Sequence, residues 1–106
     1  MTIQVFNKLV RDKIPEIISA DGRTPVTSEL NDTEYVQALK NKLNEEVAEF
    51  QDSDSLEELA DILEVVYALA KACGSDQTQI ENIRMEKTDK RGGFVKKIFL
   101  ERVESG

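Results

Sequence analysis

The densest run of ionisable side chains in this sequence is acidic. Between residues 44 and 64 the chain has nine acidic residues and no lysine or arginine: Glu45, Glu46, Glu49, Asp52, Asp54, Glu57, Glu58, Asp61 and Glu64. Residues three apart on a helix are neighbours on one face, as Glu46 with Glu49 and Glu58 with Asp61 would be. Carboxylate oxygens are the ligands that Mg²⁺ prefers, and a divalent cation would offset their mutual repulsion. The spacing therefore raises the hypothesis of a divalent-cation site.

A simpler interpretation of the same acids stays open. Acids in the first turn of a helix offset its macrodipole, and Glu57, Glu58 and Asp61 have suitable positions for that role. Glu58 stands three residues after Ser55, as in a capping box. Glu45 lies almost opposite the apolar stripe of its helix and fits an ordinary solvated surface. Spacing alone does not choose between a metal site and a solvated face.

Two amphipathic helices must position the acids. The first is expected over residues 32–50, where Asn31 and Glu34 form a capping-box pattern. Its apolar residues recur at helical spacings: Val36, Leu39, Leu43, Val47 and Phe50. The other helix is expected to start at Ser55 and to end at Gly74, and it is apolar on nearly every side, which is typical of a bundle interior or a subunit interface.

An antiparallel arrangement of these helices would bring four carboxylates together near the turn that joins them. Glu46 lies about 60° from the centre of the apolar stripe, at ~100° per residue, and so points partly inward. Asp52 and Asp54 belong to the turn, whereas Glu57 and Glu64 are expected to face water.

The chain ends predict a smaller set of elements. "IPEIISADG" reads as a short helix with Pro15 in its first turn, and a further helix is expected over residues 76–89. Phe94, Ile98 and Leu100 suggest a short closing strand, paired with an extended N-terminal segment. The expected fold class is mainly α, a helical bundle with a minor short β element from the chain ends, in a single domain over residues 1–106.

Composition excludes several function classes. The net charge of −7 argues against binding to nucleic acid or to an anionic membrane. The sequence has no signal peptide and no long apolar run, so we expect a cytoplasmic protein. Without histidine, and with one cysteine, a zinc site or a Ser/His/Asp triad is excluded. Cys73 lies in an apolar helical stretch and is expected to be buried.

The acidic motifs E-E-x-x-E (Glu45 to Glu49) and E-x-x-D (Glu58 to Asp61) resemble those of the MazG-like all-α nucleoside triphosphate pyrophosphohydrolases. "NKLVRDKIPEII" and "DKRGGFVKKIFLE" look like the branch of predicted house-cleaning enzymes related to the phosphoribosyl-ATP pyrophosphohydrolases. Only eight residues separate Glu49 from Glu58, which favours a compact, phosphoribosyl-ATP-like form over a dUTPase-like one.

The resemblance implies a reaction and a set of site residues. Mg²⁺, or Mn²⁺ in its place, would be held by Glu46, Glu49, Glu58 and Asp61. Glu45, Glu46 and Glu49 would form the catalytic set, with Glu45 a supporting acid or base. The enzyme would cleave a nucleoside triphosphate between the α- and β-phosphates, giving a monophosphate and pyrophosphate. The alternatives are a dedicated phosphoribosyl-ATP pyrophosphohydrolase of histidine synthesis and a non-enzymatic helical module that binds a basic partner.

A triphosphate near an acidic site needs basic groups around it. The candidates are Lys8, Arg11, Lys13, Lys87, Lys90 and Arg91. Arg91 precedes Gly92 and Gly93, so backbone amides there could join the side chain in phosphate binding. The same residues also suit a solvated surface or salt bridges between subunits. Two such helix pairs would complete a four-helix core, so a homodimer or homotetramer is expected.

Overall fold

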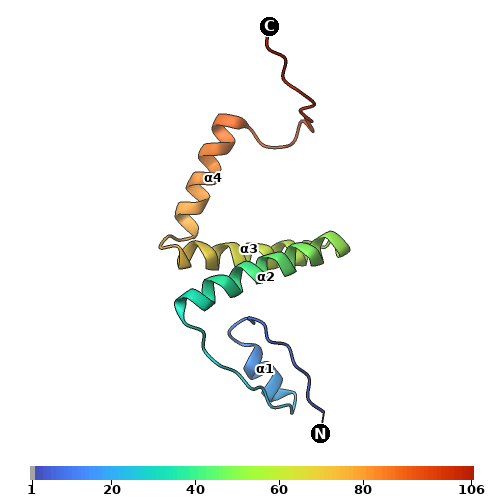
Figure 1. The fold of residues 1–106 in the computed structure, drawn as a ribbon, viewed down its shortest axis with the longest axis vertical. Helices are drawn as coiled ribbons and strands as arrows, with labels where there is room; N and C mark the ends of the chain where they lie inside the picture. The colour runs from blue at the N-terminus through green and yellow to red at the C-terminus, as the bar shows by residue number, and fades with distance from the viewer. Residues whose placement is uncertain (1) are drawn as a thin grey trace.

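The computed structural model of the chain describes residues 2–106, which form four helices and no strand (Figure 1). The helices are α1 (Ile14–Ala20), α2 (Asp32–Ser53), α3 (Leu56–Ala72) and α4 (Gln77–Arg91). The predicted fold class, mainly α, is confirmed. Each expected helix is present, and α2 continues three residues beyond the expected end at Phe50.

Local capping explains where α2 begins. The side chain of Asn31 accepts a hydrogen bond of 2.8 Å from the backbone N–H of Glu34, and the Glu34 carboxylate accepts one of 3.1 Å from the N–H of Asn31. This reciprocal capping box satisfies two backbone donors that the first helical turn leaves without partners. The predicted start of the helix is therefore confirmed in its atomic detail.

A two-residue connection reverses the chain between α2 and α3. Asp54 ends α2 with a left-handed backbone (φ 54°), a conformation that Asp tolerates better than most residues. Ser55 then caps α3, because its hydroxyl oxygen accepts a hydrogen bond from the N–H of Glu58. The connection sends α3 back alongside α2, and these two helices make the most extensive contact in the fold (Figure 1).

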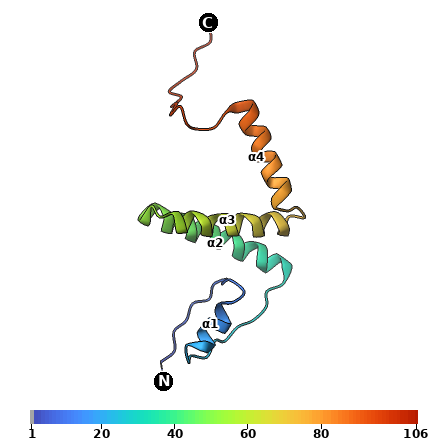
Figure 2. The same ribbon diagram turned by 180° about the vertical axis from the view of Figure 1, so that it is seen from behind.

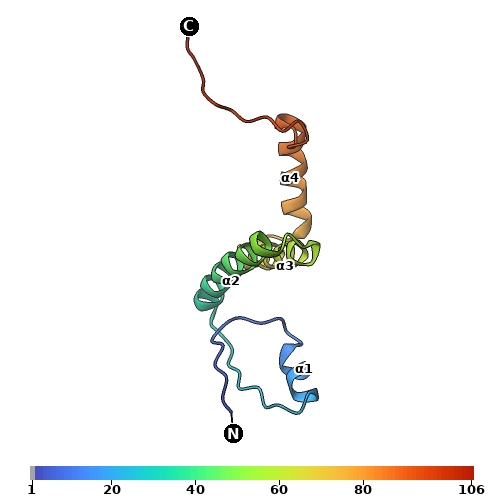
Figure 3. The ribbon, with the colours of Figure 1, turned by 90° about the vertical axis from the view of Figure 1, so that its right-hand side faces the viewer.

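The remaining elements lie on opposite sides of the α2–α3 pair. The N-terminal segment and α1 lie on one side, and α4 points away from the other (Figures 2 and 3). α4 contacts α3 near their junction. The chain measures 71 × 32 × 23 Å, with a radius of gyration of 18.9 Å against about 13 Å for a compact domain of this size.

Such an open chain has a very small core. Among residues 2–106, Leu39 and Val65 are the buried apolar side chains, and both lie in the α2–α3 pair. Cys73 is exposed, so the expectation of a buried thiol is wrong for this chain: it follows the last turn of α3, where no other element covers it.

The expectation of a minor β element is also wrong. Phe94, Ile98 and Leu100 are exposed and form no strand, and α4 carries them to the far end of the molecule from the N-terminus (Figure 2). A strand requires a hydrogen-bonding partner about 4.8 Å away, and within one chain the two ends are too far apart to provide it.

Candidate metal centre

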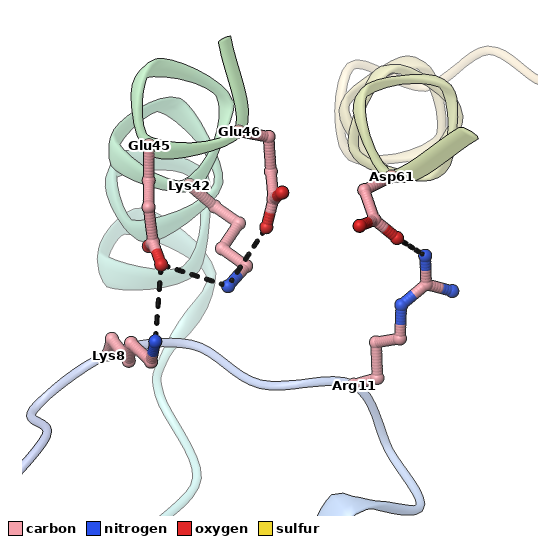
Figure 4. A network of polar contacts seen from close by, with 6 residues as sticks. All are labelled: Lys8, Arg11, Lys42, Glu45, Glu46 and Asp61. Carbon is pink, nitrogen blue, oxygen red and sulfur yellow. Dashed lines mark hydrogen bonds and ion pairs between the residues drawn. The ribbon is translucent and has the colours of Figure 1, made fainter. Parts of the chain in front are cut away.

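Three carboxylates from α2 and α3 meet in the α2–α3 pair. Glu46 on α2, and Glu58 and Asp61 on α3, each place one oxygen so that the three atoms lie within 4.8 Å of one another. Figure 4 shows the side chains of Glu46 and Asp61 extending from the two helices toward the same space. We call these three residues the acid cluster. They are three of the four predicted metal ligands.

The acid cluster contains polar atoms that the protein does not satisfy. Glu46 is only 6% exposed, which confirms that it points inward. Its Oε2 and the Oε2 of Glu58 are both buried and accept no hydrogen bond. A buried carboxylate oxygen without a partner costs free energy that a bound cation would offset.

Glu58 does not complete a capping box at the start of α3. The backbone N–H of Ser55 donates to the hydroxyl oxygen of Ser53 at 3.2 Å, where a capping box would use the Glu58 carboxylate. The Glu58 side chain is directed to the acid cluster instead. The capping alternative for this residue is therefore wrong, although Ser55 itself caps the helix as expected.

Glu49 lies outside this set of three oxygens but acts on it through its charge. Desolvation, followed by the negative charge of Glu49, raises the pKa of Glu58 to about 7, and Asp61 adds to the effect. Desolvation also raises the pKa of Glu46, with a further contribution from Glu49, although Lys42 opposes the shift. Glu49 itself is exposed. The four predicted ligands are thus electrostatic neighbours, and Glu49 is the exposed member of the four.

Basic side chains satisfy part of this charge (Figure 4). Lys42 lies one helical turn before Glu46, and its Nζ is 3.3 Å from Glu46 Oε1 and 3.6 Å from Glu45 Oε1. Lys8 approaches Glu45 Oε1 at 3.2 Å from the N-terminal segment. Desolvation acts to raise the pKa of Glu45, but the hydrogen bond from Lys8 and the charge of Lys42 hold it below its ordinary value. Glu45 is therefore a paired, ionised acid and not a plain solvated one.

Arg11 reaches the acid cluster itself. Its guanidinium donates to Asp61 Oδ1 at 2.7 Å, from the same N-terminal segment that carries Lys8. The segment thus joins α2 through Lys8 and α3 through Arg11. Both ion pairs are partly exposed, so each contributes roughly 0–1 kcal/mol to stability.

The acid cluster suits a small hard cation. Mg²⁺ binds oxygen at about 2.1 Å, so two of its ligands are at most about 4.2 Å apart. Oxygens within 4.8 Å of one another reach that geometry with a small side-chain adjustment. The donors are all carboxylate oxygens, which match Mg²⁺ or Mn²⁺ and not a softer metal.

The structure brings some of the predicted phosphate-binding residues to the site and not others. Lys8 and Arg11 flank the acid cluster. Lys13 is exposed before α1 and makes no ion pair within residues 2–106. Lys87, Lys90 and Arg91 lie along the part of α4 that points away from α2 and α3, so this chain does not bring them to its own acids (Figure 1). Arg91, Gly92 and Gly93 instead line a concave surface of the C-terminal segment.

Sequence reasoning missed Lys42. It borders the acidic run, and its spacing of four residues from Glu46 is the spacing of a helical ion pair. That signal was present in the sequence. Glu45 and Glu46 therefore have a basic partner close to them in the sequence, although the acidic run itself contains none.

Comparisons with known proteins identify one relative of undescribed function. A Mycolicibacterium smegmatis protein, described as an uncharacterized protein, is 58% identical over 48 residues, which are 45% of this chain and 49% of the relative. The match therefore spans about half the length of that relative. No protein-family profile and no solved structure matches the chain. Within residues 2–106, no helix has both the length and the apolar character needed to cross a membrane.

Proposed function

We propose that the protein is a Mg²⁺-dependent nucleoside triphosphate pyrophosphohydrolase of the MazG-like kind, acting in the cytoplasm on a noncanonical nucleotide. The observation that carries this proposal is the acid cluster, where Glu46, Glu58 and Asp61 converge and two buried oxygens have no hydrogen-bond donor. Such a cluster costs free energy in the folded chain unless a cation occupies it. The sequence resemblance to this superfamily supplies the reaction class.

The side chains around the acid cluster have distinct roles in this proposal. Glu46, Glu58 and Asp61 would hold the cation, and the exposed Glu49 would be the fourth carboxylate ligand. When bound, Mg²⁺ neutralises phosphate oxygens and lowers the pKa of a coordinated water. Glu45 is kept ionised by Lys8 and Lys42, so it is able to accept a proton from the attacking water or to orient it.

Basic residues would receive the phosphates. Arg11 already lies beside Asp61, and its planar guanidinium is suited to bidentate contact with a phosphate group. Lys8, from the same segment, pairs with Glu45. We propose that Lys87, Lys90 and Arg91 reach a site only across an interface between copies, since α4 carries them away from the acids of their own chain. A homodimer or homotetramer is part of this proposal.

Pyrophosphate release tests the activity. Purified protein with 5 mM Mg²⁺ is incubated with standard, oxidised and otherwise modified nucleoside triphosphates and with phosphoribosyl-ATP, and the products are separated. We expect a monophosphate and pyrophosphate from at least one substrate. Asp61→Asn should remove this activity, whereas Glu29→Gln, an equal charge change on an exposed acid of the loop before α2, should retain it. Release of inorganic phosphate alone, or full activity of Asp61→Asn, would contradict the proposal.

The ion pairs of the N-terminal segment favour a second candidate function. Because the acidic face accepts Lys8 and Arg11 from a non-helical stretch, it also has the charge to bind a basic segment of another protein. A Mg²⁺ titration separates the candidates. A rise in Tm at millimolar or lower Mg²⁺ favours the enzyme, and an unchanged Tm favours the binding module.

A further inference from the structure

Residues 94–103, which we call the C-terminal arm, expose an unusual amount of apolar surface. The arm contains six large apolar residues, each at least 73% exposed: Phe94, Val95, Ile98, Phe99, Leu100 and Val103. Large contiguous apolar surfaces of this kind mark interaction sites. The arm forms no helix and, in a single chain, buries none of these side chains.

The position of α4 keeps the arm away from its own core. α4 has 15 residues, so it is about 22 Å long, and it contacts α3 only near their junction. The arm begins after the opposite end of α4 (Figure 3). α4 therefore holds the arm away from the α2–α3 pair of its own chain.

α3 offers an apolar surface that no element of its own chain covers. Leu56, Leu59 and Leu63 follow one another at spacings of three and four residues, which places them on one side of the helix. They are 81%, 40% and 50% exposed, because the packed side of α3 is the one that carries Val65 toward α2. We call these three leucines the outer face of α3.

The charges beside these two surfaces are complementary. Glu57 and Glu64 are exposed and directly follow Leu56 and Leu63, so each lies about 100° around α3 from its leucine. The arm carries Lys96 and Lys97 between its apolar residues, and neither lysine makes an ion pair within residues 2–106. An apolar strip edged by acids on one chain thus matches an apolar segment with two lysines on another.

We propose that the C-terminal arm docks on the outer face of α3 of a second copy of this chain, and that two copies exchange arms reciprocally. The apolar residues of the arm cover the leucines, and Lys96 and Lys97 pair with Glu57 and Glu64. The exchange gives each chain the covering layer that its own open shape lacks. It does not depend on the catalytic proposal, because none of these residues belongs to the acid cluster.

Isotope-mixed cross-linking tests the exchange directly. Full-length chains of natural abundance and chains labelled with ¹⁵N are mixed in denaturant, refolded together and treated with a carbodiimide, which joins a lysine amine to a carboxylate in contact. We expect cross-links from Lys96 or Lys97 to Glu57 or Glu64, with half of them joining a light peptide to a heavy one. Cross-links within one isotope only would show that the arm folds back on its own chain and would overturn the proposal.

Paired variants test the same contact through self-association, measured by sedimentation equilibrium. Phe94→Ser with Phe99→Ser should raise the dissociation constant at least about 100-fold, as expected for loss of two aromatic anchors. Leu59→Ser with Leu63→Ser should also weaken association. Because one variant retains its outer face and the other its arm, mixing them should restore a heterodimer that neither forms alone.

A charge swap distinguishes loss of the proposed contact from unfolding of the variant. Lys96→Glu with Lys97→Glu should weaken association about tenfold, and adding Glu57→Lys with Glu64→Lys in the same chain should restore it. Arg23→Glu with Lys40→Glu, an equal charge change on exposed residues elsewhere, should leave it unchanged. A wild-type chain that stays monomeric at 100 µM, an arm variant that associates as tightly as wild type, or a swap without recovery would each overturn the proposal.

Discussion

The α2–α3 pair and the C-terminal arm differ in what they leave without a partner. The pair encloses carboxylates, with Glu46 buried and two oxygens accepting no hydrogen bond. The arm does the reverse, since it leaves six large apolar side chains in water. Burial without pairing and exposure without covering both cost free energy. A cation would stabilise the buried carboxylates, and another protein surface would stabilise the exposed apolar side chains.

The comparison also separates local from tertiary structure. α2, α3 and α4 each have a side-chain N-cap, from Asn31, Ser55 and Asp76. These caps define the helices without help from distant parts of the chain. The acid cluster requires only that α2 and α3 pack together. The apolar residues of the arm, in contrast, are not buried by any contact within a single chain.

The largest expected effect is on catalysis. Glu58→Gln removes the charge of one proposed metal ligand while retaining the shape of the side chain, and we expect pyrophosphate release to fall by roughly 10²–10⁴-fold, the range typical for loss of an essential site group. Glu29→Gln, at an exposed acid of the loop before α2, is the control and should keep activity within about twofold. Equal activity of the two variants would remove the functional distinction between enclosed and solvated acids.

Removal of the arm should have the next largest effect. A chain ending at Gly93 is expected to lose self-association by at least about 100-fold, because the apolar anchors are gone. Its binding of Mg²⁺, measured by isothermal titration calorimetry, should change less than threefold if the site of one chain is assembled by that chain alone. A parallel loss of Mg²⁺ binding would show that the two regions are coupled and that the site needs the second copy.

The pH dependence of stability should reveal the enclosed charge. The pKa of Glu58 is about 7 in the folded chain against an ordinary value of 4.5, so between these pH values the folded chain holds a proton that the unfolded chain has released. Without divalent cations, Tm should therefore fall as pH rises from 4.5 through 7. Glu58→Gln should flatten this slope and Glu64→Gln should not. A slope in the opposite direction would contradict the unpaired state of Glu58.

Mg²⁺ should reverse that behaviour. Because the cation competes with the proton for the same carboxylates, its stabilising effect should grow as pH rises from 5 to 8. At 100 times its dissociation constant a ligand adds about 2.7 kcal/mol to the free energy of unfolding. Equal stabilisation by Mg²⁺ at both pH values would place the cation elsewhere. Thermal melts at fixed ionic strength make this measurement.

The smallest effect concerns the N-terminal segment. Arg11→Gln removes the contact with Asp61 and should lower the free energy of unfolding by less than about 1 kcal/mol, as is usual for a partly exposed pair. Mg²⁺ affinity should rise a few fold, since Asp61 is then freed from a competing cation. Lys13→Gln, which removes a charge without an ion pair, should do neither in urea melts or calorimetry.

The sequence was sufficient to predict the helices because their ends are encoded locally. The capping box at Asn31 and the N-cap at Ser55 are short-range signals, and both are present in the structure. The inward direction of Glu46 also followed from helical geometry, since its phase relative to the apolar stripe is fixed by sequence position. Three of the four expected ligands meet for the same reason: the helices are regular and the connection is short.

The features that could not be predicted from the sequence depend on how distant parts of the chain are arranged in space. Because α4 points away from α2 and α3, Lys87, Lys90 and Arg91 lie far from the acids of their own chain. No local sequence signal predicts this direction of α4. The expected strand failed for the same reason, since strand pairing joins segments far apart in the chain. Lys8 and Arg11 contact the acids from a non-helical segment, and residue spacing does not predict the course of such a segment.

The connection between α2 and α3 consists of only Asp54 and Ser55, and this length fixes the rotational phase of one helix against the other. Inserting one residue at the start of α3 would turn it by about 100° and shift it by 1.5 Å relative to its partner. Such a turn would point Glu58 and Asp61 away from Glu46 while leaving the composition and helicity of the chain almost unchanged. Tolerance to insertions and deletions at this connection should therefore be lower than at any other loop of the molecule.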